Sequence, residues 1–310
     1  MKRIDRRGFL GTVGGVGALA ALRPGLASAW EGPGQAAPAA GGGLKKAVYV
    51  SMLPEKLPYA ERFQLARDVG FEGIEIGTID NDAEAQEIKA AAQKTGLKIH
   101  SVMNADHWKY PFSSDDPAVV AKGVAGMEQS FKNAKLWGAD AILLVPGVVD
   151  AKTPYEAAWK RSQQVIRERV LPMASDLKIA VGIEEVWNKF LLSPVEMARY
   201  IDEFQSPWIR AYVDVGNMIF YGFPQDWIRT LGKRIVRIHV KDFKLERGKG
   251  AFSWTNLGEG DVNWPEVRKA LADVGYQGWI TTEIDDGDAA YLKDVVARLD
   301  RFFAGQKPVA

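Results

Sequence analysis

Cysteine is absent from the chain, and histidine is scarce. With no cysteine among its 310 residues, the protein forms no disulfide bond and has no thiolate metal site. Only three histidines are present, so a metal ion would have to be bound mainly by carboxylates.

The chain also lacks long apolar runs and a strong net charge. The apolar stretch over residues 9–22 is rich in Gly and Ala and too short to span a bilayer. The net charge is +1, but residues 1–29 hold five basic residues and one acidic residue, so the remainder is faintly acidic. Such a body does not offer the basic surface that binds nucleic acid. We therefore expect no nucleic-acid partner, and no stable membrane insertion once residues 1–29 are removed.

The first 29 residues have the pattern of an export signal. Basic residues precede the apolar stretch, and Ala27-Ser28-Ala29 fits a cleavage site. The run Arg6-Arg7-Gly8-Phe9-Leu10 resembles the twin-arginine export motif. We therefore expect residues 1–29 to be a signal peptide, residues 30–43 to be a flexible linker, and the protein to work in the periplasm or outside the cell. A disordered basic tail is the alternative.

From residue 44 onward, short apolar strand patterns alternate with amphipathic helix patterns. The predicted strands cover residues 46–52, 74–79, 98–103, 140–145, 177–183, 209–215, 234–243 and 278–284. The predicted helices cover residues 59–69, 83–95, 117–137, 154–175, 194–204, 224–231, 264–274 and 289–303. Alternation of this kind implies parallel strands with right-handed crossovers.

Eight strands and eight helices at this length predict an α/β fold, a single-domain (β/α)8 TIM barrel over residues 44–306. An open doubly wound sheet is the alternative. The sequence after the first strand is Ser51-Met52-Leu53-Pro54, where that sheet would carry a Gly-rich nucleotide-binding turn. We therefore expect a barrel, with its active site at the C-terminal ends of the strands.

Four neighbouring strands carry metal-binding residues near those ends. The fifth ends in Glu184-Glu185, the sixth and seventh contain Asp214 and His239, and the eighth ends in Glu283. A lone acid at a strand end is often a helix cap or a solvated loop residue, but four neighbouring strands favour a site. Three carboxylates and one imidazole suit Mn²⁺, Mg²⁺ or Co²⁺, with Zn²⁺ as an alternative.

The period of two along a strand predicts which side chains face the barrel axis. Glu184 shares a face with Gly182, so we expect it to point inward and Glu185 outward. On the seventh strand, His239 is expected to point inward. Its neighbours Val236, Ile238 and Val240 are expected on the outer face.

At these positions the chain resembles the sugar isomerases and epimerases of the xylose-isomerase-like barrel group. That group includes the tagatose and psicose 3-epimerases, and endonuclease IV shares the fold. The resemblance covers about residues 45–303, and its residues are EEVWNKF at 184–190, DVGN at 214–217, RIHVKD at 237–242, LGEGDVNW at 257–264 and Thr282-Glu283. It implies one divalent metal ion, Mn²⁺ in the first place, bound by Glu184, Asp214, His239 and Glu283.

The resemblance also implies an activity on small-molecule sugars. The metal ion would acidify the proton on the carbon beside a carbonyl by stabilising an enediolate. Glu184 and Glu283 would remove and return that proton. The chain departs from the epimerases at Asn217, where they have a histidine that binds substrate.

Other residues are candidates for contacts with the substrate. Lys241 and Asn217 lie at the same rim, with surface lysine as the alternative for Lys241. His107 is as well explained as a surface histidine. Trp187, together with Trp108 and Phe190, would form an apolar wall against a sugar ring or would be ordinary packing. Asp242 follows Lys241 and is a further candidate, whereas His100 is expected inside the fold.

Two other functions remain open. A lyase or hydrolase acting on 3-keto-sugars or glycosides would remove the same proton and then eliminate a group. A non-catalytic sugar-binding barrel is the second alternative, although binding alone does not need four metal ligands. Endonuclease activity is disfavoured by the three histidines and the faintly acidic body. A homo-oligomer is left open.

Overall fold

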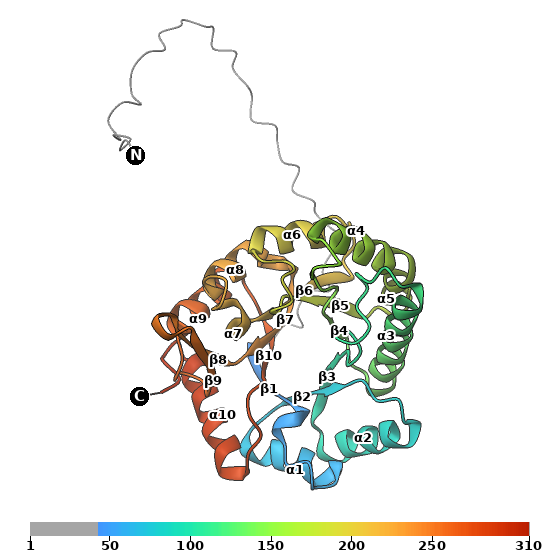
Figure 1. Ribbon diagram of the computed structural model, residues 1–310. Helices are drawn as coiled ribbons and strands as arrows, with labels where there is room; N and C mark the ends of the chain where they lie inside the picture. Colours follow the sequence, from blue (N-terminus) through green and yellow to red (C-terminus); the bar gives the residue numbers. More distant parts are fainter. Residues whose placement is uncertain (1–42, 310) are drawn as a thin grey trace, which may run out of the picture. The chain divides into compact units, whose positions relative to one another are not determined.

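The structure is a computed structural model that describes residues 43–309. Over this range eight parallel strands close into a barrel, and helices surround it (Figure 1). The predicted (β/α)8 fold is therefore confirmed. The predicted signal peptide at residues 1–29 and the linker up to residue 42 lie outside the described residues. Within residues 43–309, no helix has the length and apolar character needed to cross a membrane.

Strands that follow one another along the chain are neighbours in the barrel, and the last strand closes against the first. For example, Lys46 of the first strand pairs with Ile280 of the last. The barrel strands are β1 (Leu44–Tyr49), β2 (Gly73–Gly77), β3 (Lys98–Met103), β4 (Ala141–Leu144), β5 (Ala180–Glu184), β6 (Ile209–Asp214), β7 (Ile235–Val240) and β10 (Gly278–Thr282).

The helices occupy the predicted positions, with one short addition after β6. They are α1 (Tyr59–Val69), α2 (Asp82–Thr95), α3 (Pro117–Trp137), α4 (Tyr155–Val165), α5 (Leu171–Leu177), α6 (Pro194–Asp202), α7 (Val215–Met218), α8 (Pro224–Leu231), α9 (Trp264–Asp273) and α10 (Ala289–Phe303). Single turns lie at η1 (Val50–Met52), η3 (Gly232–Arg234) and η4 (Arg247–Lys249).

Side-chain caps explain where several helices begin. Asn81, Asp116, Ser193, Asn263 and Asp288 each accept a hydrogen bond from a backbone N–H in the first turn of the following helix. Each such cap contributes about 1 kcal/mol. The predicted start of α6 at its Ser-Pro pair is therefore confirmed.

The predicted helix at residues 154–175 contains a π-helical segment, η2 (Ile166–Val170), between α4 and α5. Pro172 is the second residue after this segment. Proline lacks an N–H and its ring clashes with the preceding turn of an α-helix. A wider turn accommodates it. The helix then continues to Leu177, so the fifth strand starts at Ala180 and not at residue 177 as predicted.

The main apolar core lies between the strands and the helices. Ile74, Ile142 and Val181 of the strands and Phe63 and Met127 of the helices are buried members of it. A second, smaller apolar cluster is formed by Leu143, Val145, Val186 and Tyr212, and polar side chains are buried as well. His100, predicted to lie inside, is fully buried and stacks on Trp279 with 4.8 Å between ring centroids.

Close packing inside the barrel explains a glycine and corrects one facing prediction. A Cβ at Gly182 would lie 2.9 Å from Tyr212 Cδ2 and 3.2 Å from Val236 Cγ1. Only glycine therefore leaves room for both neighbours. Val236 was predicted on the outer face, but the register between β6 and β7 shifts there, pairing Ala211 with Ile235 and Tyr212 with Arg237. Val236 is skipped in the pairing, which turns it toward Gly182.

The predicted seventh strand, residues 234–243, is divided at Lys241. Strand β7 ends at Val240, and the chain then forms an antiparallel hairpin of β8 (Asp242–Glu246) and β9 (Ala251–Thr255). The sequence prediction missed this hairpin. Its turn contains Gly250 at φ +61°, and Phe243 pairs with Trp254 across the two strands.

Asp242 anchors the loop that leads from the hairpin to α9. Its fully buried side chain accepts hydrogen bonds from the backbone N–H of Phe243 and Val262 through Oδ1. Its Oδ2 accepts from the N–H of Gly258 and from Trp264 Nε1, both at 2.8 Å. With both oxygens engaged, Asp242 is a structural residue, and the prediction that it contacts substrate is wrong.

We expect Asp242→Asn to lower the free energy of unfolding by about 3 kcal/mol, because the new NH2 group would face hydrogen-bond donors inside the fold. Asp273→Asn is the matched control. Asp273 is exposed and paired with Arg229, so its loss should cost less than about 1 kcal/mol. Urea unfolding followed by circular dichroism measures both. Equal midpoints for the two variants would contradict this role of Asp242.

Candidate metal and active site

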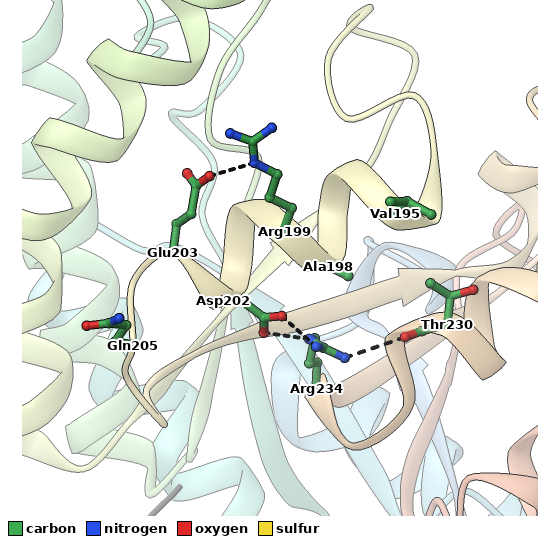
Figure 2. Close-up of a pocket in the computed structure, with 8 residues that line it drawn as sticks. All are labelled: Val195, Ala198, Arg199, Asp202, Glu203, Gln205, Thr230 and Arg234. Atoms are coloured by element: carbon green, nitrogen blue, oxygen red, sulfur yellow. Dashed lines mark hydrogen bonds and ion pairs between the residues drawn. The ribbon is translucent and has the colours of Figure 1, made fainter. Parts of the chain in front are cut away.

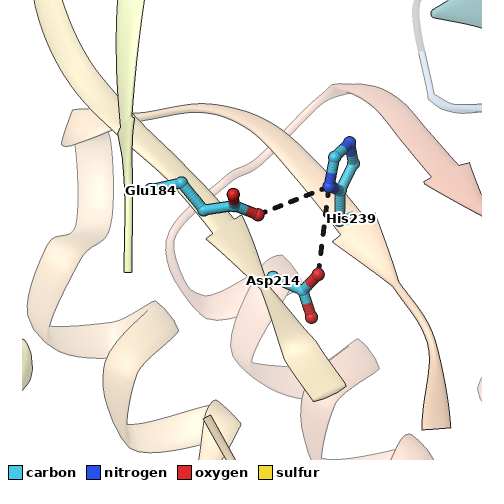
Figure 3. A group of neighbouring side chains, drawn as sticks. All are labelled: Glu184, Asp214 and His239. Carbon is cyan, nitrogen blue, oxygen red and sulfur yellow. Dashed lines mark ion pairs between the residues drawn. The ribbon is translucent and has the colours of Figure 1, made fainter. Parts of the chain in front are cut away.

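Glu184, Asp214 and His239 meet at the C-terminal rim of the barrel. Figure 3 shows Glu184 and Asp214 pointing from neighbouring strands toward the same ring nitrogen of His239. Glu184 Oε1 lies 3.4 Å from His239 Nδ1, and Asp214 Oδ2 lies 3.9 Å from it. Ligand atoms of the three residues lie within 4.8 Å of one another, a spacing that suits a metal ion.

Glu283 reaches the same nitrogen from the fourth strand. It directly follows β10, and its Oε2 lies 3.3 Å from His239 Nδ1. The side chain of Glu283 is 25% exposed, whereas those of Asp214 and His239 are fully buried. Glu283 therefore lies at the open side of the cluster, where a substrate would approach.

A fourth acid, Glu75 of β2, holds His239 from the other side. Its Oε2 lies 2.5 Å from His239 Nε2, and its Oε1 accepts hydrogen bonds from Ser101 Oγ at 2.7 Å and Tyr212 OH at 2.9 Å. A carboxylate in this position holds the proton on Nε2, so the lone pair of Nδ1 faces the three other acids. The sequence prediction missed Glu75, although an acid within the apolar strand GIEIG was a usable signal.

The electrostatics of the cluster favour a bound cation. Burial works against the charged form of His239, but Tyr212, Glu75 and Glu283 outweigh it and raise its pKa well above the usual value. Burial is also the main cause that raises the pKa of Glu184 to about 7, with further contributions from Asp214 and Glu283. These shifts show that the site concentrates negative charge, which a divalent cation would offset.

The donor set fits such an ion. Among the described residues, His239 Nδ1 is buried and has no hydrogen-bond partner, although three carboxylates surround it. An imidazole nitrogen with three carboxylate oxygens is a ligand set typical of Mn²⁺ and related ions. The geometry places Glu184 in this set, while Glu185 does not face His239.

Lys241 supplies a positive charge to the cluster. Its Nζ lies 2.9 Å from Asp214 Oδ2 and 2.7 Å from Glu283 Oε2. The side chain is 14% exposed, so the alternative of a surface lysine is wrong. Burial opposes its charge, but Asp214, Glu283 and Glu184 raise its pKa. Lys241 thus stays charged and lies where it can contact an oxygen of a substrate.

Glu185 and Asn217 lie beside the same rim, and Asn217 contacts the backbone of Glu185. Asn217 Nδ2 donates to the carbonyl oxygen of Glu185 at 3.2 Å, and the N–H of Asn217 donates to Asp214 Oδ1 at 2.9 Å. The Glu185 side chain is only 1% exposed, and burial raises its pKa well above the usual value. The backbone of Asn217 thus orients Asp214, and the side-chain NH2 group of Asn217 is engaged by the Glu185 carbonyl oxygen.

The pKa values of two further side chains, His107 and Tyr49, are affected by the acids of the cluster. His107 is only 6% exposed, so the alternative of a surface histidine is wrong. Burial lowers its pKa to about 4, against the opposing effect of Glu283. Tyr49, at the end of β1, was missed from the sequence. Burial first, then Glu75 and Glu283, raise the pKa of Tyr49 to about 12. Both groups are therefore neutral near pH 7.

The three residues of the predicted aromatic wall do not lie together in the structure. Phe190 is fully buried and packs against Tyr155 and Tyr200 with centroids 5.2 and 5.6 Å apart, so its prediction as a wall residue is wrong. Trp108 is 54% exposed and lies edge-on to His107. Trp187 is partly buried and belongs to a different aromatic group, described below.

A groove with a volume of about 570 Å³ lies elsewhere on the protein and is lined by none of these residues. Its lining side chains are drawn in Figure 2. Ion pairs cross it, with Arg234 Nη2 2.5 Å from Asp202 Oδ2 and Arg199 Nε 2.7 Å from Glu203 Oε1. Because its charged groups are paired with one another, it does not provide chemistry comparable to the rim. Its lining residues are Val195, Ala198, Arg199, Asp202, Glu203, Gln205, Thr230 and Arg234.

Comparison with known proteins identifies the family of this chain. The family described as xylose isomerase-like TIM barrel matches residues 63–301. The chain belongs to this family. An L-ribulose-5-phosphate 3-epimerase of Escherichia coli is 26% identical over 242 residues, which cover 74% of this chain and 84% of that protein.

Solved structures show the xylose isomerase-like fold in proteins of lower identity. A 3-keto-D-glucoside 4-epimerase from E. coli superposes with a TM-score of 0.69 at 18% identity, over 83% of this chain and 99% of that one. A D-allulose 3-epimerase from Methylomonas sp., in complex with D-allulose, gives 0.64 at 20% identity, over 79% of this chain and 85% of that one.

We expect Glu75→Gln to weaken Mn²⁺ binding about 10- to 100-fold, because His239 would lose the carboxylate that holds its ring and tautomer. Glu72→Gln is the control, since Glu72 is exposed and, in the described hydrogen bonds, its side chain accepts only the Lys46 N–H. Isothermal titration calorimetry of metal-stripped protein measures the dissociation constants. Unchanged affinity in a folded Glu75→Gln protein would show that the Glu75–His239 contact does not support a metal site.

Proposed function

We propose that this protein is a divalent-metal-dependent sugar epimerase or isomerase. In this proposal it removes the proton from the carbon beside a sugar carbonyl, passes through an enediolate, and returns a proton to the opposite face or to the neighbouring carbon. The observation that carries the proposal is the position of Glu184 and Glu283. Both lie within 3.4 Å of the same nitrogen of His239, at a rim that opens on the Glu283 side.

The two glutamates differ in their electrostatic surroundings. Burial alone would raise the pKa of Glu283, but Lys241 and His239 overcome it and hold the pKa well below the usual value. Glu283 is thus ionised and suited to accept a proton at Oε2. Burial raises the pKa of Glu184 to about 7 when no metal ion is bound, and a cation bound to its carboxylate would lower that pKa. One glutamate would accept the proton from the sugar carbon and the other would return a proton.

A divalent ion bound by Glu184, Asp214, His239 and Glu283 would polarise the carbonyl oxygen and stabilise the negative charge that develops on it. Lys241 would contribute in two ways. Its ammonium group keeps Glu283 ionised, and it can donate a hydrogen bond to a substrate oxygen. Mn²⁺ is our first choice of metal, with Mg²⁺, Co²⁺ and Zn²⁺ as the others to compare.

The similar proteins support epimerisation. The three described above are named as epimerases of L-ribulose 5-phosphate, a 3-keto-D-glucoside and D-allulose. These substrates differ in ring form and phosphorylation, so they support a sugar as substrate class and leave the individual sugar to experiment.

Incubation of Mn²⁺-loaded protein with ketoses in D₂O should place deuterium on the carbon beside the carbonyl, as detected by NMR. Glu283→Gln and His239→Ala should each lower the exchange rate at least about 1000-fold, because one removes the base and the other a metal ligand. Glu266→Gln, an exposed acid on α9, is the matched control and should exchange normally. Absence of exchange with every ketose tested would refute the proposed reaction.

We also propose that the protein is exported by the twin-arginine pathway, on the basis of Arg6-Arg7 and the following apolar stretch. Changing both arginines to lysine should leave the full-length protein in the cytoplasm, because the pathway reads the arginine pair. Cell fractionation and immunoblotting measure this. Lys2→Ala is the control, since it changes a basic residue outside the pair and should be exported. Equal export of the double-lysine variant would rule out this route.

A further inference from the structure

Exposed aromatic rings gather beside the candidate site. Phe220, Phe252 and Trp254 are 43%, 53% and 41% exposed. Their ring centroids lie 5.1, 5.1 and 4.9 Å from that of Trp187. These four residues are called the aromatic platform below. They come from three separate segments: the loop after β5, the segment after α7, and strand β9 of the hairpin.

The aromatic platform rests on a fixed base. Trp187 Nε1 donates to the carbonyl oxygen of Asn217 at 3.0 Å, and the Trp187 ring packs against the buried ring of Phe243 with centroids 5.0 Å apart. Trp254 lies nearly parallel to Trp187, at 18°. Exposed apolar patches on a rigid support are a common sign of a binding surface.

The platform is continuous with the reacting centre. Lys241 Nζ, which pairs with Glu283 and Asp214, lies 4.9 Å from the Trp254 ring centroid. Gly216 permits this approach, because a Cβ there would lie 2.6 Å from Lys241 Cγ and 3.2 Å from Trp254 Cζ3. One side chain therefore separates the candidate base Glu283 from the platform.

We propose that the aromatic platform binds the second ring of a two-ring substrate: a further sugar ring or an aryl group linked to the sugar that reacts at Glu184 and Glu283. This inference rests on the proposed function for the position of the reacting sugar. The C–H face of a pyranose, or an aryl ring, stacks on aromatic side chains and leaves its polar edge in water. The direct continuity through Lys241 favours a part of the substrate over a separate partner as the occupant.

The platform can be tested by binding, without any reaction. Purified full-length protein is titrated with methyl β-D-glucoside and with phenyl β-D-glucoside, and the tryptophan fluorescence of the platform is followed. The phenyl glucoside should bind about tenfold more tightly, which corresponds to about 1.4 kcal/mol. The double variant Phe220→Ala/Phe252→Ala should lose this preference and still contain both reporter tryptophans. Val195→Ala, an exposed apolar residue in the groove of Figure 2, should keep it.

The reaction provides a second measurement. Deuterium exchange is compared for D-fructose and for lactulose, a ketose that carries a second sugar ring. In the unchanged protein, kcat/KM should be about tenfold higher for lactulose than for D-fructose. This ratio should fall toward one in Phe220→Ala/Phe252→Ala and be retained in Val195→Ala.

Two outcomes would overturn the proposal. One is equal binding of the methyl and phenyl glucosides by the unchanged protein. The other is a dimer, seen by analytical ultracentrifugation, that dissociates in the double variant while the ligand preference stays the same, since a second copy would then cover the platform. Failure of the proposed function would be seen separately, because no ketose would then take up deuterium. The fluorescence titration would still show whether the aromatic platform binds a second ring.

Discussion

The concentration of acidic side chains around one buried imidazole is the constraint on which the rest of the site depends. Glu184, Asp214 and Glu283 approach His239 Nδ1, and Glu75 occupies the opposite nitrogen. Carboxylates so close together repel one another and are poorly solvated when buried. The arrangement is stable only if positive charge enters it. Lys241 brings one such charge, and a divalent ion in the space before Nδ1 would bring the rest.

The closed barrel holds these acidic side chains together despite their mutual repulsion. Each acid comes from a different strand, and the strands are held in register by their ladders and by the apolar layer under the helices. The backbone therefore does not have to bend to bring the charges together. The interior below the site is filled by Tyr212 and by the pair of His100 and Arg237, whose Nε donates to His100 Nδ1 at 3.2 Å. These side chains lie below the cluster, on the side away from the C-terminal rim.

The sequence predicts this architecture well because it depends on local patterns. Strand and helix positions follow from periodicity, from caps such as Ser193 and from glycines after helices, all of which act over a few residues. The acids at strand ends could be found because a parallel barrel brings those ends together wherever they lie in the chain. Even the choice of Glu184 as the residue that faces His239 needs only the period of two.

What the sequence does not show depends on contacts between distant residues. Glu75 precedes His239 by 164 positions, and no local rule connects an acid in β2 with an imidazole in β7. The inward turn of Val236 comes from a register shift with β6, which depends on both strands. Asp242 looked like a reactive acid because it follows Lys241 directly. Its role became clear only with the four donors that fold over it from residues 243–264.

Lys241 lies between strand β7 and the hairpin of β8 and β9, where the sequence analysis predicts a single strand over residues 234–243. Before it, β7 belongs to the barrel and carries His239. After it, the chain leaves the barrel to form the hairpin that carries Trp254. The ammonium group contacts acids of the first part and the indole of the second. A change in the position of Lys241 would therefore alter both its ion pair with Glu283 and its contact with the Trp254 ring of the aromatic platform. A ligand that moves Lys241 would have to replace the ion pair with Glu283 and the contact with the Trp254 ring. A ligand that reaches both the reacting centre and the aromatic platform can replace both contacts.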